Sequence, residues 1–175
     1  RLVTNIAALR QAGATQLTGD AAAQPATTGP CTSLPTLLET TGSTFIADPE
    51  SLIVEVFGNA TLLVRCGSLE ELTRAVAGVH GALAASVYGA RDGSDESAFE
   101  RIAPLLVEKA GRVVENRMTT GMAVVPPMQH GGPWPSAAPP FYSAVGMPWT
   151  ILRYARRICF DGWSQGHLPA ILKDA

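Results

Sequence analysis

Residues 61–115 alternate strand and helix candidates with short links, and this alternation constrains the fold more than any other feature of the chain. In chain order the candidates are a strand at 61–66, a helix that begins at Ser68, a strand at 82–88, a helix at about 94–109 and a strand at 112–115. Alternation of this kind with short links is typical of right-handed βαβ units. The sequence therefore predicts an α/β fold, with a mainly parallel sheet and flanking helices.

Local signals define several of these elements. Ser68 and Glu71 fit a capping box at a helix start, and Gly111 is expected to end the helix before the strand at 112–115. The consecutive apolar residues 62–64 predict a strand that is buried on both faces. Two further elements are predicted upstream, namely a helix at 2–12 and a strand at 35–39.

Three segments fall outside this pattern. Residues 18–33 are rich in Ala, Thr, Pro and Gly without periodicity, which predicts a mobile surface loop. Residues 126–148 contain seven prolines and three glycines, a density that excludes a helix or a central strand. Because this segment also carries large apolar side chains, we expect a long ordered loop with a function. Residues 156–160 predict an exposed last strand that would pair with another subunit.

Composition bounds the class of protein. At 175 residues the chain is one domain or a piece of a larger one. The net charge of -2 argues against a nucleic-acid partner, and no apolar run is long enough to span a bilayer. We therefore expect no nucleic acid, no membrane and a cytoplasmic location. His80, His130 and His167 have no Cys, Asp or Glu at ligand spacing, so no metal site is predicted.

A short motif precedes the strand at 61–66. Val54-Glu55-Val56-Phe57-Gly58 resembles the Glu-x-Phe-Gly motif of NAD(P)-dependent aldehyde dehydrogenases. The resemblance implies that the Glu55 carboxylate accepts hydrogen bonds from both hydroxyls of the nicotinamide ribose, while the Phe57 ring limits where the nicotinamide sits. The family usually has Pro after the Gly, whereas this chain has Asn59. The structural alternative is a surface Glu beside a core Phe, at a turn closed by Gly58.

A second set of blocks resembles the same family more closely. The blocks are Gly111-Arg112-Val113-Val114-Glu115-Asn116, Thr120-Gly121, His130-Gly131-Gly132-Pro133-Trp134-Pro135, Ser143-Ala144-Val145-Gly146 and Arg156-Arg157-Ile158-Cys159-Phe160. Together they resemble the ketoglutarate-semialdehyde dehydrogenase branch, which oxidises 2,5-dioxopentanoate. The resemblance spans about residues 34–172 and implies that residues 1–175 are the C-terminal part of an aldehyde dehydrogenase catalytic domain, which is incomplete here.

By the same resemblance, one loop lines the aldehyde entrance. Its residues are Met128, Gln129, His130, Gly131 and Gly132. His130 stands where the wider family often has an aromatic side chain. The branch has small polar and acidic residues after this block, whereas this chain has the apolar segment 137–142. The substrate implied by the branch is therefore less firmly indicated than the family.

The chain lacks other parts that the family uses. Its nucleophilic cysteine in a Gly-Gln-x-Cys setting, its carboxylate base and its dinucleotide-binding domain all precede the Glu-x-Phe-Gly motif. Cys31, Cys66 and Cys159 have no base nearby in sequence, so we expect no catalytic residue in this chain. The family acts through a thiohemiacetal, hydride transfer to the cofactor and thioester hydrolysis.

Two hypotheses follow. In the first, the chain is part of an enzyme that uses NAD or NADP on an aldehyde substrate and forms a homo-oligomer. No bound cofactor is expected on the isolated chain, because its affinity for NAD(P) should be roughly millimolar or weaker. In the second, it is a non-catalytic self-associating or assembly domain. An upstream reading frame with Gly-Gln-x-Cys would favour the first, and a start codon directly before Arg1 would favour the second.

Overall fold

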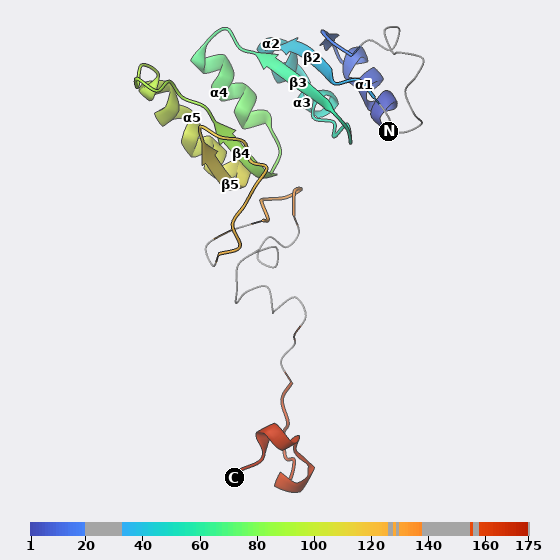
Figure 1. Ribbon diagram of the computed structural model, residues 1–175, viewed down its shortest axis with the longest axis vertical. Coiled ribbons are helices and arrows are strands. Elements are labelled where there is room, and N and C mark those ends of the chain that lie inside the picture. The colour runs from blue at the N-terminus through green and yellow to red at the C-terminus, as the bar shows by residue number, and fades with distance from the viewer. Residues whose placement is uncertain (20–32, 126–127, 129, 138–154, 156–157, 175) are drawn as a thin grey trace.

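The computed structural model of the protein describes residues 1–19, 33–125, 128, 130–137, 155 and 158–174. Its strands form two small sheets. The first has the order β1-β2-β3 and the second pairs β4 with β5 (Figure 1). The strands are β1 (Thr15–Gln16), β2 (Thr36–Thr41), β3 (Ala60–Arg65), β4 (Ala82–Val87) and β5 (Ala110–Glu115). The helices are α1 (Leu2–Gln11), α2 (Gly42–Ala47), α3 (Pro49–Leu52), α4 (Leu69–Gly78) and α5 (Glu96–Lys109), with short 3-10 turns at Gln165–His167 and Ala170–Leu172.

The predicted α/β class is confirmed. β2 and β3 are parallel, with Thr36 opposite Ala60, and β4 and β5 are parallel, with Ala82 opposite Ala110. Among the described strands, only the two-residue strand β1 runs antiparallel to its neighbour β2. Helices connect both parallel pairs, as the alternation in the sequence predicts. Within the described residues, however, β3 and β4 do not pair, so the strands form two sheets and not one.

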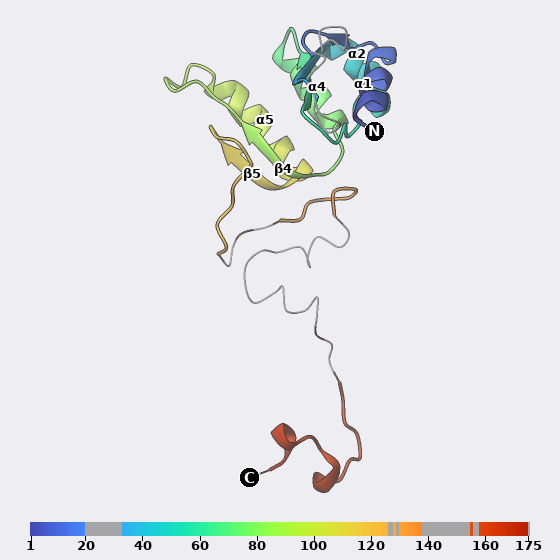
Figure 2. The same ribbon diagram turned by 45° about the vertical axis from the view of Figure 1, so that its right-hand side comes forward.

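The hydrophobic core lies between the first sheet and its helices. Leu38 of β2 and Leu9 of α1 are essentially inaccessible to solvent. The other buried members of the cluster are Ala14, directly before β1, and Phe45, Leu52 and Ala75 from α2, α3 and α4. α4 also contacts α5, so the helices continue from the first sheet to the second (Figures 1 and 2). This layer joins the two sheets, although their strands remain separate.

The prediction of a strand buried on both faces at 62–64 is wrong. Burial alternates along β3, and Leu63 is 44% exposed while Leu62 and Val64 pack against the core. The exposed face also holds an ion pair between Arg65 and Glu39 of β2. Among the described elements, helices cover one face of this sheet only, and an apolar run cannot reveal which faces are covered.

Capping hydrogen bonds define the start of α4. Ser68 accepts a hydrogen bond from the Glu71 amide at 3.1 Å, which confirms the helix start, and the Glu71 carboxylate accepts from the Gly67 amide at 2.6 Å. α5 ends at Lys109, and the chain turns directly into β5 at Ala110. The prediction that Gly111 ends this helix is therefore wrong, because Gly111 is a residue of β5.

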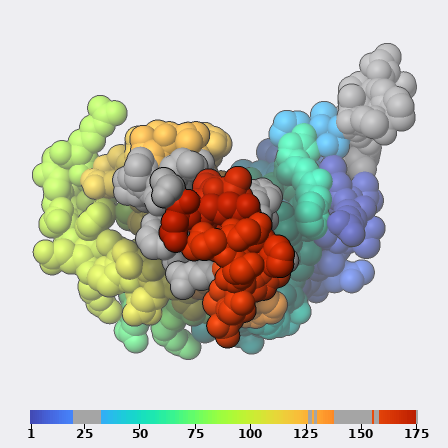
Figure 3. Space-filling view, turned by 90° about the horizontal axis from the view of Figure 1, so that it is seen from below, coloured from blue at the N-terminus to red at the C-terminus, as the bar shows by residue number. Residues whose placement is uncertain are grey.

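The three irregular segments are described only in part. Residues 20–32 of the predicted 18–33 loop lie outside the described residues. In the described part of 126–148 there is neither helix nor strand, as predicted. Residues 156 and 157 are not described, and 158–160 have no strand structure, so a strand there stays a prediction for an assembly. The C-terminal segment, in red, lies apart from both sheets in Figure 1 and projects in front of them in Figure 3.

Candidate functional site

An open cleft of about 860 Å³ lies between the two sheets. One wall is the segment Leu52–Glu55, which begins at the last residue of α3 and leads toward β3. The opposite walls are the start of β4, the segment around Thr119–Met122 and the loop that carries His130. Glu55 and His130, which are distant in sequence and were singled out for different roles, therefore line the same cleft.

Glu55 presents its carboxylate at this cleft. The residue is exposed, and no hydrogen bond or ion pair to another described residue engages its side-chain oxygens. Its backbone carbonyl, in contrast, accepts a hydrogen bond from the Asn5 side-chain amide of α1 at 2.8 Å. The backbone is thus held while the carboxylate stays available as a paired acceptor, which suits the cis-diol of a ribose.

Phe57 lies just beyond the cleft and is not a core residue. Its ring is 59% exposed, and its backbone has a φ of 53°, a left-handed conformation that is uncommon for a non-glycine residue. The Arg1 guanidinium carbon lies 5.2 Å from the ring centroid. The structural alternative of a core Phe therefore fails, because more than half of the Phe57 side chain is open to solvent.

The loop with His130 is seated on the second sheet through glycines. A Cβ on Gly111 of β5 would overlap the Gly131 carbonyl oxygen, and one on Gly81 would overlap the carbonyls of Pro133 and Trp134. Gly132 packs equally closely on the Ala82 carbonyl. Only hydrogen atoms at these positions let the backbones approach. The loop is therefore a fixed wall of the cleft.

The five residues predicted for the aldehyde entrance have different environments. His130 is exposed and lines the cleft, whereas Gly131 and Gly132 are buried against the second sheet. Met128 is half-buried, and Gln129 lies outside the described residues. The geometry thus assigns contact with the cleft to His130 and a supporting position to the two glycines.

Comparison with known proteins identifies the chain's family. It is 35% identical over 139 residues, 79% of its length, to alpha-ketoglutaric semialdehyde dehydrogenase 2 of Azospirillum brasilense. It is 32% identical over 80% of its length to the alpha-ketoglutaric semialdehyde dehydrogenase of Acinetobacter baylyi. An aldehyde dehydrogenase structure from Bacillus cereus superposes with a TM-score of 0.53 at 25% identity, covering 75% of this chain and 24% of that one.

The chain belongs to the aldehyde dehydrogenase family. It spans about a quarter of the length of its curated relatives, 26% in both cases. A betaine aldehyde dehydrogenase from Staphylococcus aureus in complex with NAD+ shares the fold, with a TM-score of 0.53 at 22% identity over 75% of this chain and 24% of that one. No model of a protein family matches the chain.

Arg112 lines this cleft and is a residue that the sequence analysis did not assign to it. Its guanidinium donates to the carbonyl oxygens of Thr119 and Gly121, the latter at 2.7 Å, and so ties the irregular segment after β5 to the strand. Its Nε is buried without a hydrogen-bond partner among the described residues. Since both bonds end on backbone carbonyls, no sequence pattern could have revealed them.

His80 also lines the cleft. Its Nε2 lies 2.6 Å from a carboxylate oxygen of Glu50 on α3. Within the described residues, no group of three or more His, Cys, Asp or Glu could hold a metal ion.

The described cysteines are poorly suited to nucleophilic chemistry. Burial, and after it the nearby Glu71 carboxylate, raise the pKa of the Cys66 thiol, so Cys66 stays protonated near neutral pH. Cys159 is exposed in the C-terminal segment, and neither residue lines the cleft. Cys31 lies outside the described residues. The helices in the described part include none long and apolar enough to cross a membrane.

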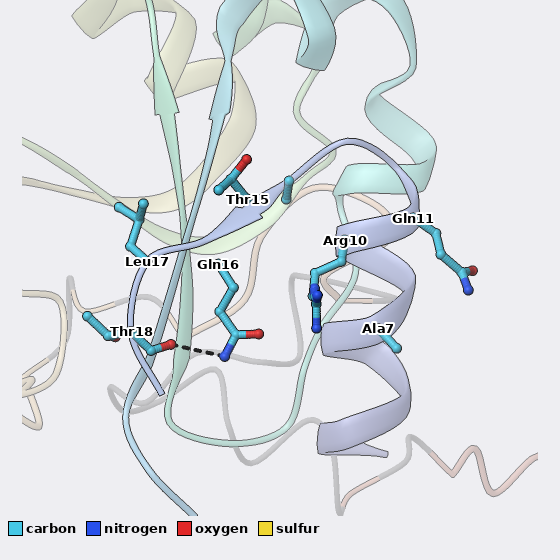
Figure 4. A pocket seen from close by; sticks show the side chains of 8 residues that line it. Ala7, Arg10, Gln11, Thr15, Gln16, Leu17 and Thr18 are labelled. Atoms are coloured by element: carbon cyan, nitrogen blue, oxygen red, sulfur yellow. Dashed lines mark hydrogen bonds between the residues drawn. The ribbon is translucent and has the colours of Figure 1, made fainter. Parts of the chain in front are cut away.

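A second hollow, of about 760 Å³, lies between α1 and β1 (Figure 4). Arg10 of α1 and Gln16 of β1 come from opposite walls, and the Gln16 side chain donates to the Thr18 carbonyl at 3.1 Å. None of the residues predicted to bind cofactor or substrate lines this hollow. The cleft with Glu55 and His130 is therefore the candidate site.

Proposed function

We propose that this chain supplies the nicotinamide-ribose contact and part of the substrate entrance of an NAD(P)-dependent aldehyde dehydrogenase, which oxidises an aldehyde to a carboxylate. The observation that carries the proposal is the cleft itself. A carboxylate with no described partner, that of Glu55, stands on one wall, and the fixed loop with His130 stands on another. The named activities of the relatives support the same reaction class.

Each residue has a part in this proposal. The cofactor, when bound, accepts the hydride. Glu55 holds its ribose through two charge-assisted hydrogen bonds, worth roughly 1.5–3 kcal/mol each. Phe57 restricts the position of the nicotinamide ring, and His130 lines the path of the aldehyde. The names of the relatives favour 2,5-dioxopentanoate as the substrate. Because neither described cysteine lines the cleft, we infer that the nucleophile lies in a part of the enzyme that this chain does not span.

We expect the isolated chain to have no aldehyde dehydrogenase activity. The described cysteines lie away from the cleft, and without a covalent nucleophile only binding effects remain. The measurement is NAD(P)H formation from short aldehydes at high protein concentration. Turnover above background that disappears when Cys31, Cys66 or Cys159 is replaced by Ser would contradict the assignment of the nucleophile.

We also expect the isolated chain to self-associate. Large apolar side chains of the C-terminal segment are open to solvent, among them Ile158 at 59%, Trp163 at 54% and Ile171 at 91%. Outer edges of both sheets lack a described partner strand, and such edges and patches drive association. Light scattering at tens of micromolar (roughly the range in which weak interfaces fill,) should show oligomers. A strictly monomeric species would argue against the proposed homo-oligomer.

The second candidate function, a non-catalytic self-associating domain, rests on the same exposed surfaces. Unlike the enzyme proposal, it predicts that the Glu55 carboxylate binds no ligand. Association without any response of the Glu55–Gly58 segment to a nicotinamide nucleotide would favour it.

A further inference from the structure

The first turn of α1 contacts the cofactor motif at successive positions. Asn5 donates from its side-chain amide to the Glu55 carbonyl at 2.8 Å. The Leu2 side chain packs so closely on Gly58 that a Cβ there would lie 2.7 Å from its Cδ1. Arg1, directly before the helix, lies over the ring of Phe57. One end of one helix thus contacts the turn from Glu55 to Gly58 along its length.

This helix is itself firmly anchored. Leu9, one turn further along α1, is 1% exposed in the core, and Ile6 packs against the same cluster. Asn5 is therefore presented from a rigid element. The turn that it contacts has no regular secondary structure, and Phe57 within it adopts a left-handed backbone conformation that costs free energy. Such a conformation persists only where its surroundings hold it.

We propose that Asn5 is a positioning residue for the nicotinamide-ribose contact: its hydrogen bond fixes the backbone of Glu55 and so aims the carboxylate and the Phe57 ring at the cofactor. This inference rests on the proposed function of Glu55 and Phe57. Asn5 itself does not touch the cofactor. Asn5 and Glu55 are 50 residues apart in sequence, so the pairing is visible only in the fold.

The matched test variant is Asn5→Asp. Aspartate has the same shape but cannot donate to a carbonyl, and a negative charge in the first turn of a helix does not weaken the helix. Thr4→Ala, on the exposed side of the same turn, is the control. Thermal unfolding of both variants should stay close to that of the unaltered chain, since the core residues of α1 are unchanged.

Two readouts follow in the ¹⁵N-labelled full chain. Backbone order parameters of Val56, Phe57 and Gly58 should fall in Asn5→Asp from about 0.85 toward 0.6, values typical of rigid and flexible backbone, and stay unchanged in Thr4→Ala. Nicotinamide mononucleotide, titrated into the chain, should shift the Phe57 and Gly58 amide signals with a Kd in the millimolar range (roughly,). Asn5→Asp should raise that Kd about tenfold, as expected for a lost hydrogen bond.

The outcomes separate the two proposals. Order parameters that do not change in Asn5→Asp, or a Kd that does not change, would overturn the positioning role of Asn5. Glu55→Gln should weaken the nucleotide response while leaving the order parameters unchanged, which distinguishes the ligand contact from its support. If the unaltered chain shows no response to the nucleotide at all, the proposed cofactor role of the motif fails, whereas the order parameters still decide whether Asn5 holds the turn.

Discussion

Replacing Gly111 by Ala is expected to displace the loop with His130 from the cleft and to destabilise the second sheet. A Cβ at this position would overlap the Gly131 carbonyl oxygen and lie 3.0 Å from the Gly132 Cα, and both are backbone atoms that cannot rotate away. Overpacking of this kind typically costs about 1–3 kcal/mol. Urea unfolding should show a lower midpoint, and the backbone amide signals of His130, Gly131, Gly132, Trp134 and Ser136 should shift.

Gly121→Ala is the matched control for this prediction. It lies in the segment that borders the same cleft, but a Cβ there would have no neighbour within 4 Å. The urea unfolding midpoint of Gly121→Ala and its backbone amide signals around His130 should resemble those of the unaltered chain. If Gly111→Ala behaves like Gly121→Ala, the loop is not seated on β5 as the structure has it.

The sequence predicts those helices and strands that carry a capping residue or a periodic apolar pattern within their own few residues. The strand at 60–65, the helix from Ser68 and the helix at 96–109 all lie close to their expected positions, because caps and apolar periodicity act over a few residues. The short elements β1, α2 and α3 were not predicted. They depend on packing around the core for their stability, since their own lengths are too short for a periodic signal.

The candidate site was predictable only through its motifs. The resemblance indicated Glu55, Phe57 and His130, and the structure brings Glu55 and His130 to one cleft. It did not indicate Asn5 or Arg112. Their side chains donate to backbone carbonyls, which every residue type has, so no sequence motif marks their partners. The apolar run at 62–64 led to a wrong prediction of burial on both faces. Burial of a strand depends on which faces other elements cover, and the sequence of the strand does not show this.

Replacing Glu55 by Gln should slow hydride transfer in a complete enzyme. Gln keeps one acceptor oxygen but loses the charge, so the paired hydrogen bonds to the ribose weaken by roughly 1.5–3 kcal/mol, which corresponds to about ten- to hundredfold in rate. The residue is exposed and has no described side-chain partner, so the fold should be unaffected. Adenosine binding should hardly change, since Glu55 contacts only the nicotinamide end in this proposal.

A suitable enzyme is a chimera of the Azospirillum brasilense relative, in which the segment that aligns over 139 residues is replaced by that of this chain. Glu100→Gln, on the exposed face of α5, provides a matched control that removes the same charge away from the cleft. Circular dichroism and thermal unfolding verify that the chimera and both variants are folded.

The most direct measurement is the single-turnover rate of NAD(P)H formation by this chimera, compared with its Glu55→Gln and Glu100→Gln variants. The assignment of the motif predicts a rate roughly ten- to hundredfold lower in Glu55→Gln only, with an unchanged affinity for the adenosine half of the cofactor. An active chimera in which Glu55→Gln transfers hydride as fast as Glu100→Gln would contradict it.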